Sequence, residues 1–149
     1  MTRMLLTPLS RPTLLSTLWI VVMFNYIYAD VLGLNDPAHL VALESGTIGG
    51  LPFSPDKLVA AGLLMQVPIA MVLLSRVLRQ TPNRVFNMVA AAFMALTQVA
   101  TLFFGTPPTP VYYLFSAIEI IVLVVILAVA AAWRRTTSVA VPDTALANA

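Results

Sequence analysis

The chain has 149 residues, of which 60% are hydrophobic and only 9% are charged, and its formal net charge is +2. So few charges could not cover the surface of a soluble domain of this size, so we expect the chain to be surrounded largely by lipid. The absence of cysteine excludes disulfide frameworks, thiolate-bound metals and dithiol redox chemistry.

Four apolar segments are long enough to cross a bilayer as helices, which takes about 20 residues each. They cover residues 14–34, 58–78, 85–104 and 111–133, and Pro68 within the second segment is expected to kink its helix. The sequence therefore predicts an all-α fold, a four-transmembrane-helix bundle that forms a single membrane domain over residues 1–135. Residues 136–149 are small and polar and are expected to form a disordered tail. The first segment could instead be a signal peptide, but no cleavage site follows it and an acidic residue would be unusual there.

The basic residues are distributed asymmetrically around these spans. Seven of the eight lie before the first span, in the last turn of the second span and the loop that follows it, or after the fourth span, and only Lys57 lies in the loop after the first span. By the positive-inside rule, we expect a multi-pass protein of the cell membrane with both termini in the cytoplasm. This topology accounts for the positive net charge, so no nucleic-acid partner is expected.

The loop after the first span is the longest segment between two predicted spans. Asp36 and Pro37 match an N-cap residue followed by proline at the first helical position. The sequence thus predicts a short extracytoplasmic helix over residues 37–45, lying on the membrane surface. A turn-rich return, with three glycines and two prolines over residues 46–55, is expected to follow it.

Each predicted span carries a strong hydrogen-bonding side chain in its outer half. Asp30 lies about 6 Å and Glu119 about 12 Å from the outer ends of their spans. Because a carboxylate facing lipid costs about 2.5–3.5 kcal/mol, we expect both to point into the bundle and to line a polar cavity near its outer side. We take Glu119 and Asp30 as the catalytic candidates. The candidate substrate-binding residues are Asn25, Tyr26, Gln66, Gln98, Tyr112 and Ser116.

The charge states of the two acids are expected to differ. Apart from Arg76 at the inner end of the second span, no Lys or Arg lies within the spans, so burial favours a protonated Glu119, whereas Asp30 is expected to be nearer to ionised. Two carboxyl groups whose environments give them different charge states suit acid/base chemistry or proton-coupled binding of a cation. The polar side chains could instead hold the helices together, and Asp30 could simply be hydrated or cap its helix.

Several classes of site are excluded by what the sequence lacks. His39 is the only histidine and lies in the first loop, where it is expected to be a surface residue, so no bis-histidine haem and no multi-histidine metal site is expected. The sequence holds no nucleophile elbow, phosphate-binding loop or dinucleotide fingerprint. We therefore expect no cofactor and no metal.

Several segments resemble a known group of sequences. These are the first span "LWIVVMFNYIYADVLGL" over residues 18–34, the proline-containing second span, the pair Asn83-Arg84 and the "IEI" of the last span. Together they are similar to an uncharacterised family of small bacterial membrane proteins that is loosely grouped with DoxX-like four-helix proteins. The resemblance implies a four-helix membrane bundle and no established activity.

The sequence leaves three functions open. The favoured one is an intramembrane acid/base enzyme of isomerase, cyclase or epoxide-opening type that acts on a small lipophilic substrate, because none of these reactions needs a cofactor. The second is a proton-coupled transporter or binding protein for a small lipophilic or cationic ligand, for which four helices are few, so that a homodimer is expected. The third is an accessory subunit of a larger membrane complex.

Overall fold

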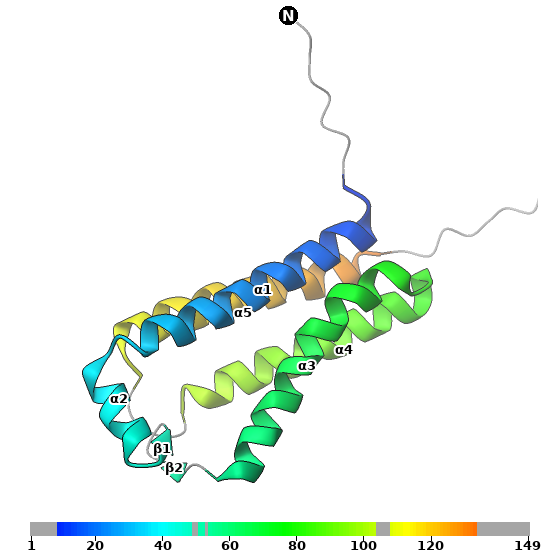
Figure 1. Ribbon diagram of the computed structural model, residues 1–149. Coiled ribbons are helices and arrows are strands. Elements are labelled where there is room, and N and C mark those ends of the chain that lie inside the picture. The colour runs from blue at the N-terminus through cyan, green and yellow to red at the C-terminus, as the bar shows by residue number, and fades with distance from the viewer. Residues whose placement is uncertain (1–8, 49–50, 53, 104–107, 134–149) are drawn as a thin grey trace, which may run out of the picture.

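The computed structural model describes residues 9–48, 51–52, 54–103 and 108–133, and the predicted disordered tail over residues 136–149 lies outside them. Within these residues the chain forms five helices and one two-stranded hairpin (Figure 1). In chain order the elements are α1 (Arg11–Gly33), α2 (Pro37–Glu44), β1 (Thr47–Ile48), β2 (Leu51–Pro52), α3 (Pro55–Val77), α4 (Gln80–Thr101) and α5 (Pro110–Ala131).

The four long helices are the candidate membrane spans. Each has 22 or 23 residues and is long and apolar enough to cross a bilayer, as is typical of a multi-pass membrane protein. The expectation of an all-α chain with four helices able to span a membrane is therefore confirmed, apart from the short antiparallel hairpin that pairs Thr47 with Pro52. α4 begins at Gln80, five residues earlier than the apolar run suggested, because Pro82 is tolerated in a first turn.

Short polar residues define where three of the helices begin. The side chains of Ser10, Asp36 and Thr109 accept hydrogen bonds from backbone N–H groups two or three residues later, and a proline follows in the first turn of each helix. The cap at Asp36 was expected, and α2 forms where the sequence predicted a short helix. Gly46, which has a φ of 73°, reverses the chain after α2 into the hairpin.

The four long helices form a ring in which each packs against the next long helix in the chain, and α5 closes the ring against α1. α1 packs between α3 and α5, and α4 packs between α3 and α5 on the other side. In Figure 1, α1 and α5 run side by side, whereas the first half of α3 leads away from the other long helices toward β2. The packing of α3 against α4 is therefore less extensive than the packing of α5 against α4.

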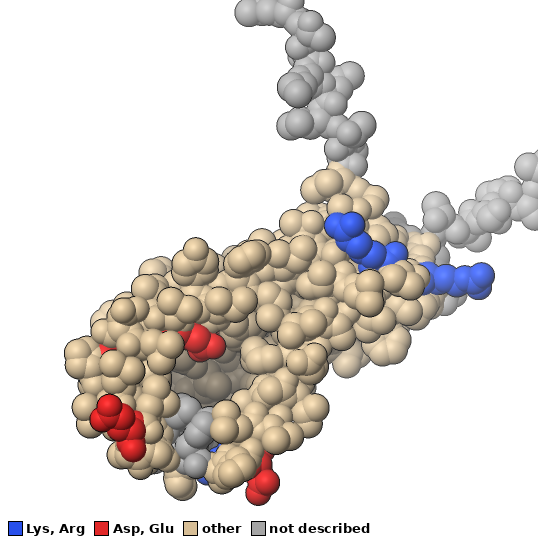
Figure 2. Space-filling view, viewed as in Figure 1, with Lys and Arg blue, Asp and Glu red and all other residues tan. Residues whose placement is uncertain are grey.

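The two ends of the bundle differ in charge. The basic end carries the described arginines Arg11, Arg76, Arg79 and Arg84, and the acidic end carries Asp30 and the loop residues that connect α1 to α3 (Figure 2). At the basic end, Nη1 of Arg11 donates a hydrogen bond of 2.7 Å to the carbonyl oxygen of Ala132. The start of α1 and the end of α5 thus lie together, as an even number of crossings requires.

The hydrophobic core is small and lies toward the basic end. Trp19 from α1, Met94 from α4 and Ile126 from α5 are among its fully buried side chains. Most other large apolar side chains on the four long helices are exposed, which suits helices that are surrounded by lipid.

A buried polar network lies beside this core and joins α1, α3 and α4. Oδ1 of Asn87 accepts hydrogen bonds from Nε1 of Trp19 at 2.7 Å and from Oγ of Ser75 at 3.1 Å. Nδ2 of Asn87 donates to Oδ1 of Asn83 at 2.7 Å, and Nδ2 of Asn83 donates to the carbonyl oxygen of Ser75 at 2.6 Å. The sequence analysis did not single out this network, although two asparagines four residues apart in an apolar helix are a signal for it.

Candidate functional site

A small cavity of about 120 Å³ lies in the half of the bundle nearer the acidic end. It is lined by eight residues from α1, α4 and α5, which are Tyr26, Ala29, Asp30, Gln98, Tyr112, Phe115, Ser116 and Glu119. Six of them belong to the set that the sequence analysis proposed. None of the eight carries a positive charge, so the cavity is an acidic site.

Glu119 is more deeply buried than Asp30, the other acid of the cavity. Its side chain is only 2% exposed, and Oη of Tyr26 on α1 donates a hydrogen bond to its Oε1 atom across the α1–α5 contact. Tyr112, Ser116 and Glu119 follow each other at spacings of four and three residues, so they share one face of α5. The sequence pattern therefore gave the correct phase for this helix.

Hydrogen bonds between α4 and α5 close one side of the cavity. Nε2 of Gln98 donates to Oγ of Ser116 at 2.7 Å, and both residues are buried. Near the end of α4, Oη of Tyr112 donates to Oγ1 of Thr101 at 2.7 Å, and Thr101 donates in turn to the backbone carbonyl of Gln98. These bonds fix the wall of the cavity that α4 and α5 form together.

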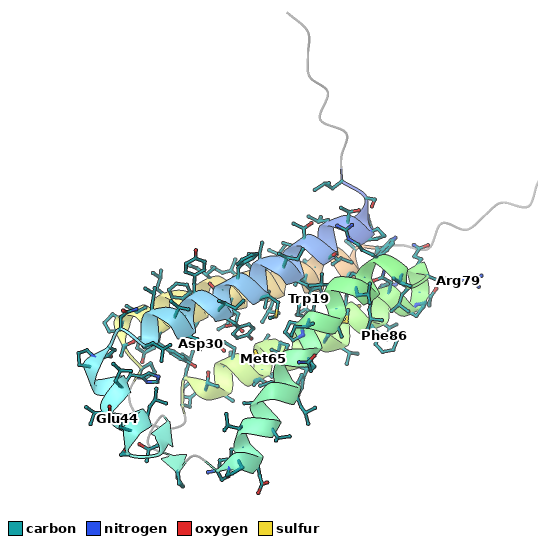
Figure 3. The ribbon with its side chains drawn as sticks, viewed as in Figure 1. Trp19, Asp30, Glu44, Met65, Arg79 and Phe86 are labelled. Carbon is teal, nitrogen blue, oxygen red and sulfur yellow. The ribbon has the colours of Figure 1, made fainter. Side chains whose placement is uncertain are left out.

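Asp30 lies at the mouth of the cavity. It lines the cavity but is exposed to the surroundings. Figure 2 shows the surface hollowed beside an acidic side chain, and Figure 3, drawn in the same view, labels Asp30 at that place. Since Tyr26 and Asp30 are four residues apart on α1, they lie one turn apart on the same helix face.

His39 lies closer to this mouth than expected. Rather than being a free surface residue, it is half-buried, and a Cβ atom added at Gly33 would lie 3.8 Å from Cδ2 of its ring. It is also close enough to Asp30 for an electrostatic interaction. The helix α2 therefore brings the only histidine of the chain near the carboxyl group at the mouth.

Two of the proposed ligand-binding residues do not line the cavity. Asn25 is buried beside it, and its Nδ2 atom donates to the carbonyl oxygen of Phe115 at 3.0 Å, so it joins α1 to α5. Gln66 is exposed on α3, because the buried residues Pro68 and Met71 define the inner face of that helix and Gln66 lies about 200° away from Pro68. The predicted layer is thus formed by three helices and not by four.

The chemistry that these groups can supply is proton donation, proton acceptance and hydrogen bonding. Among the described residues no group of three or more His, Cys, Asp or Glu side chains is arranged to hold a metal ion. The described hydrogen bonds leave Oε2 of Glu119 without a partner, since Tyr26 binds Oε1. This oxygen is the group through which Glu119 can meet a ligand.

Comparison with known proteins places the chain in a family. The chain belongs to the family of unknown function DUF6326, whose model matches residues 7–140. No curated protein and no solved structure matches the chain. The comparisons thus show an uncharacterised family, as expected, and they show no relation to DoxX-like proteins.

Proposed function

We propose that this chain is an integral membrane protein whose acidic cavity binds the polar group of a small lipophilic molecule, with Glu119 as proton donor. The observation that carries the proposal is that Glu119 is buried, accepts a hydrogen bond from Tyr26 at Oε1, has no hydrogen-bond partner at Oε2 among the described residues, and lines a cavity. A buried acid with no positively charged neighbour in its cavity is favoured in its neutral form. Such an acid can donate a hydrogen bond or a proton.

The size of the cavity limits what can enter it. Sites for whole small molecules have volumes of about 300–1,000 Å³, whereas this cavity has about 120 Å³. Only a small polar group, such as a carbonyl, an epoxide or an amine, fits inside. The apolar remainder of the ligand would extend from the mouth along exposed apolar side chains of α1, including Ile27 and Val31.

The favoured activity is acid/base catalysis without a cofactor. Glu119 would protonate the oxygen of a carbonyl or epoxide, while Asp30 at the mouth would accept a proton or stabilise a developing positive charge. Ser116 and Gln98 would orient the reacting group. Isomerisation, cyclisation and epoxide opening are all compatible with this arrangement.

The second candidate is proton-coupled binding or transport of a cation. The observation that favours it is the pair of carboxyl groups, one at the mouth and one inside, in a cavity without basic lining residues. A cation that passes Asp30 would displace the proton of Glu119. Because four helices form a narrow path, this function would require a homodimer. The third function, an accessory subunit, would need the polar residues only to join helices. It would not explain why Oε2 of Glu119 has no hydrogen-bond partner among the described residues.

The charge distribution supports an orientation in the cell membrane. With the arginines of the basic end in the cytoplasm, both termini are cytoplasmic and the acidic cavity opens toward the opposite side. α2 then lies on the extracytoplasmic surface. A ligand would enter from the outer leaflet or from the outside.

Carbodiimide labelling tests the state and accessibility of Glu119. Dicyclohexylcarbodiimide reacts with protonated carboxyl groups that can be reached from an apolar phase, whereas a water-soluble carbodiimide with an added amine reports on exposed carboxylates. We expect the first reagent to modify Glu119 and the second to modify Asp30, as read by peptide mass spectrometry. Glu119→Gln should abolish the first modification, while Glu44→Gln, the same chemical change at an exposed residue outside the cavity, should leave it unchanged.

Protection experiments then separate the two candidates. Methyl decyl ketone, dodecylamine and dodecane offer a neutral carbonyl, a cation and no polar group on similar chains. Protection of Glu119 by the ketone supports acid/base catalysis, and protection by the amine alone supports cation binding. If neither compound protects better than dodecane, or if Glu119 is not modified at all, the cavity is not a ligand site and the proposal fails.

A further inference from the structure

A second and larger cavity lies at the basic end, away from the acidic site. Its volume is about 370 Å³, within the range of sites that hold small molecules. It lies between the first turns of α4 and the end of α5, and its lining residues are Gln80, Thr81, Arg84, Val85, Met88 and Trp133. None of these residues takes part in the function proposed above.

Arg84 is the residue of this cavity that indicates a ligand. Its Nε atom is fully buried, and among the described residues it has no hydrogen-bond partner. A guanidinium group keeps its charge and presents its N–H donors in a planar fork, so a buried donor that lacks an acceptor is unfavourable. A phosphate in the cavity would form charge-assisted hydrogen bonds with this guanidinium group.

The other walls of the cavity are apolar. Val85, Met88 and Trp133 line it beside Arg84. Farther along α4, Phe86 and Val89 are exposed, at 52% and 63%, so apolar surface continues toward the centre of the membrane. A free phosphate ion would gain nothing from these walls, whereas an acyl chain attached to a phosphate would pack on them.

The surroundings of the cavity also favour an anion. Arg76 and Arg79 are exposed at the same end, and Figure 3 shows Arg79 directed away from the bundle. None of the lining residues is acidic. A tryptophan and an arginine at one level of a membrane protein are typical of the headgroup region.

We propose that this cavity binds the phosphate headgroup of an anionic phospholipid, with Arg84 as its ligand and Val85, Met88 and Trp133 as the surface for its acyl chain. Bound lipid places its phosphate beside the guanidinium group of Arg84 and fills the space between α4 and the end of α5. The cavity is thus a lipid site on the membrane face that carries the arginines. It is independent of the acidic cavity.

Tryptophan quenching tests this proposal in the full-length protein. Trp133 lines the cavity and the other tryptophan, Trp19, is fully buried, so a lipid with brominated acyl chains quenches mainly Trp133. We reconstitute the protein in phosphatidylcholine nanodiscs that contain increasing fractions of brominated phosphatidylglycerol or of brominated phosphatidylcholine. We expect saturable quenching by phosphatidylglycerol at fractions where phosphatidylcholine quenches only in proportion to its amount.

Two arginine variants provide the matched comparison. Arg84→Gln should lower the apparent affinity for phosphatidylglycerol by about tenfold, the effect of losing one charge-assisted pair. Arg79→Gln removes the same charge at the same end but outside the cavity, and should change the affinity less than about twofold. If Arg84→Gln does not fold, as judged by circular dichroism, Arg84→Lys retains the charge without the planar fork and should still weaken binding.

Three results would overturn the proposal. The first is equal quenching by the two lipids in the unchanged protein, and the second is an equal loss in Arg84→Gln and Arg79→Gln, which would indicate only diffuse attraction to the surface. The third concerns the source of the phosphate. If millimolar inorganic phosphate alone abolished the preference for phosphatidylglycerol, the site would be one for a small anion and not for a lipid.

Discussion

Asn87 offers the sharpest test of how polar contacts stabilise this bundle. We consider Asn87→Leu, which keeps the size of the side chain and removes its amide. The change removes hydrogen bonds with Trp19, Ser75 and Asn83. Such bonds contribute about 0.6 kcal/mol each on average within membrane proteins and up to about 1.7 kcal/mol. Since Trp19 is fully buried and water cannot replace its lost acceptor, we expect the free energy of unfolding to fall by about 2–4 kcal/mol.

The measurement is reversible unfolding in mixed micelles by titration with sodium dodecyl sulfate, followed by circular dichroism. Thr97→Val is the control on the same helix, because within the described part of the chain the side chain of Thr97 donates only to the carbonyl oxygen of Phe93 in α4. This control should change the unfolding free energy by less than about 0.5 kcal/mol. A double-mutant cycle with Trp19→Phe should give a coupling energy of about 0.6–1.7 kcal/mol between Trp19 and Asn87.

The reasoning is refuted if Asn87→Leu is as stable as the unchanged protein, or if the coupling energy is close to zero. Either result would mean that packing of the surrounding aliphatic side chains holds the bundle together without help from the indole–amide bond. A large loss in Thr97→Val would be equally damaging, since it would show that any polar side chain on α4 has the same effect.

The remaining predictions concern the acidic cavity and the orientation. Gln66→Leu should leave both the unfolding free energy and the carbodiimide modification of Glu119 unchanged, because Gln66 is exposed on α3; a clear loss of modification would place Gln66 at the site after all. Since the chain has no cysteine, single substitutions Glu44→Cys and Arg79→Cys can be labelled in intact cells with a membrane-impermeant maleimide. We expect labelling at position 44 and none at position 79, and the reverse pattern would invert the proposed orientation.

The sequence predicts the four spans because lipid imposes their length and apolar character directly. α2 was also predictable, since Asp36 supplies a local cap that does not depend on packing. The angular position of a polar residue around its helix is harder to predict from the sequence. On α5 the residues from Tyr112 to Glu119 repeat on one face and mark the inner side, whereas α3 is apolar almost all round and Gln66 has no polar companion to define its phase. The sequence allowed us to estimate the depth of the polar residues along both α3 and α5. It indicated which way those residues face only for α5.

α4 shows why burial of polar residues alone does not locate a site. Asn87 toward the basic end and Gln98 toward the acidic end are both buried, so by burial they are equivalent. They differ in whether a hydrogen-bonding group next to them remains without a partner. The network around Asn87 satisfies its amide with protein groups, and Asn87 lines neither of the two cavities that we describe.

The surroundings of Gln98 differ from those of Asn87 in this respect, because Gln98 lines a cavity together with Glu119, whose Oε2 atom has no hydrogen-bond partner among the described residues. The same criterion selects Arg84, whose buried Nε lacks an acceptor next to the second cavity. Remaining hydrogen-bonding capacity beside open space is what separates a binding group from a structural one. By that criterion the two cavities are the candidate binding sites that we propose, an acidic one near one end of the bundle for a neutral or cationic group and a basic one at the other end for an anion.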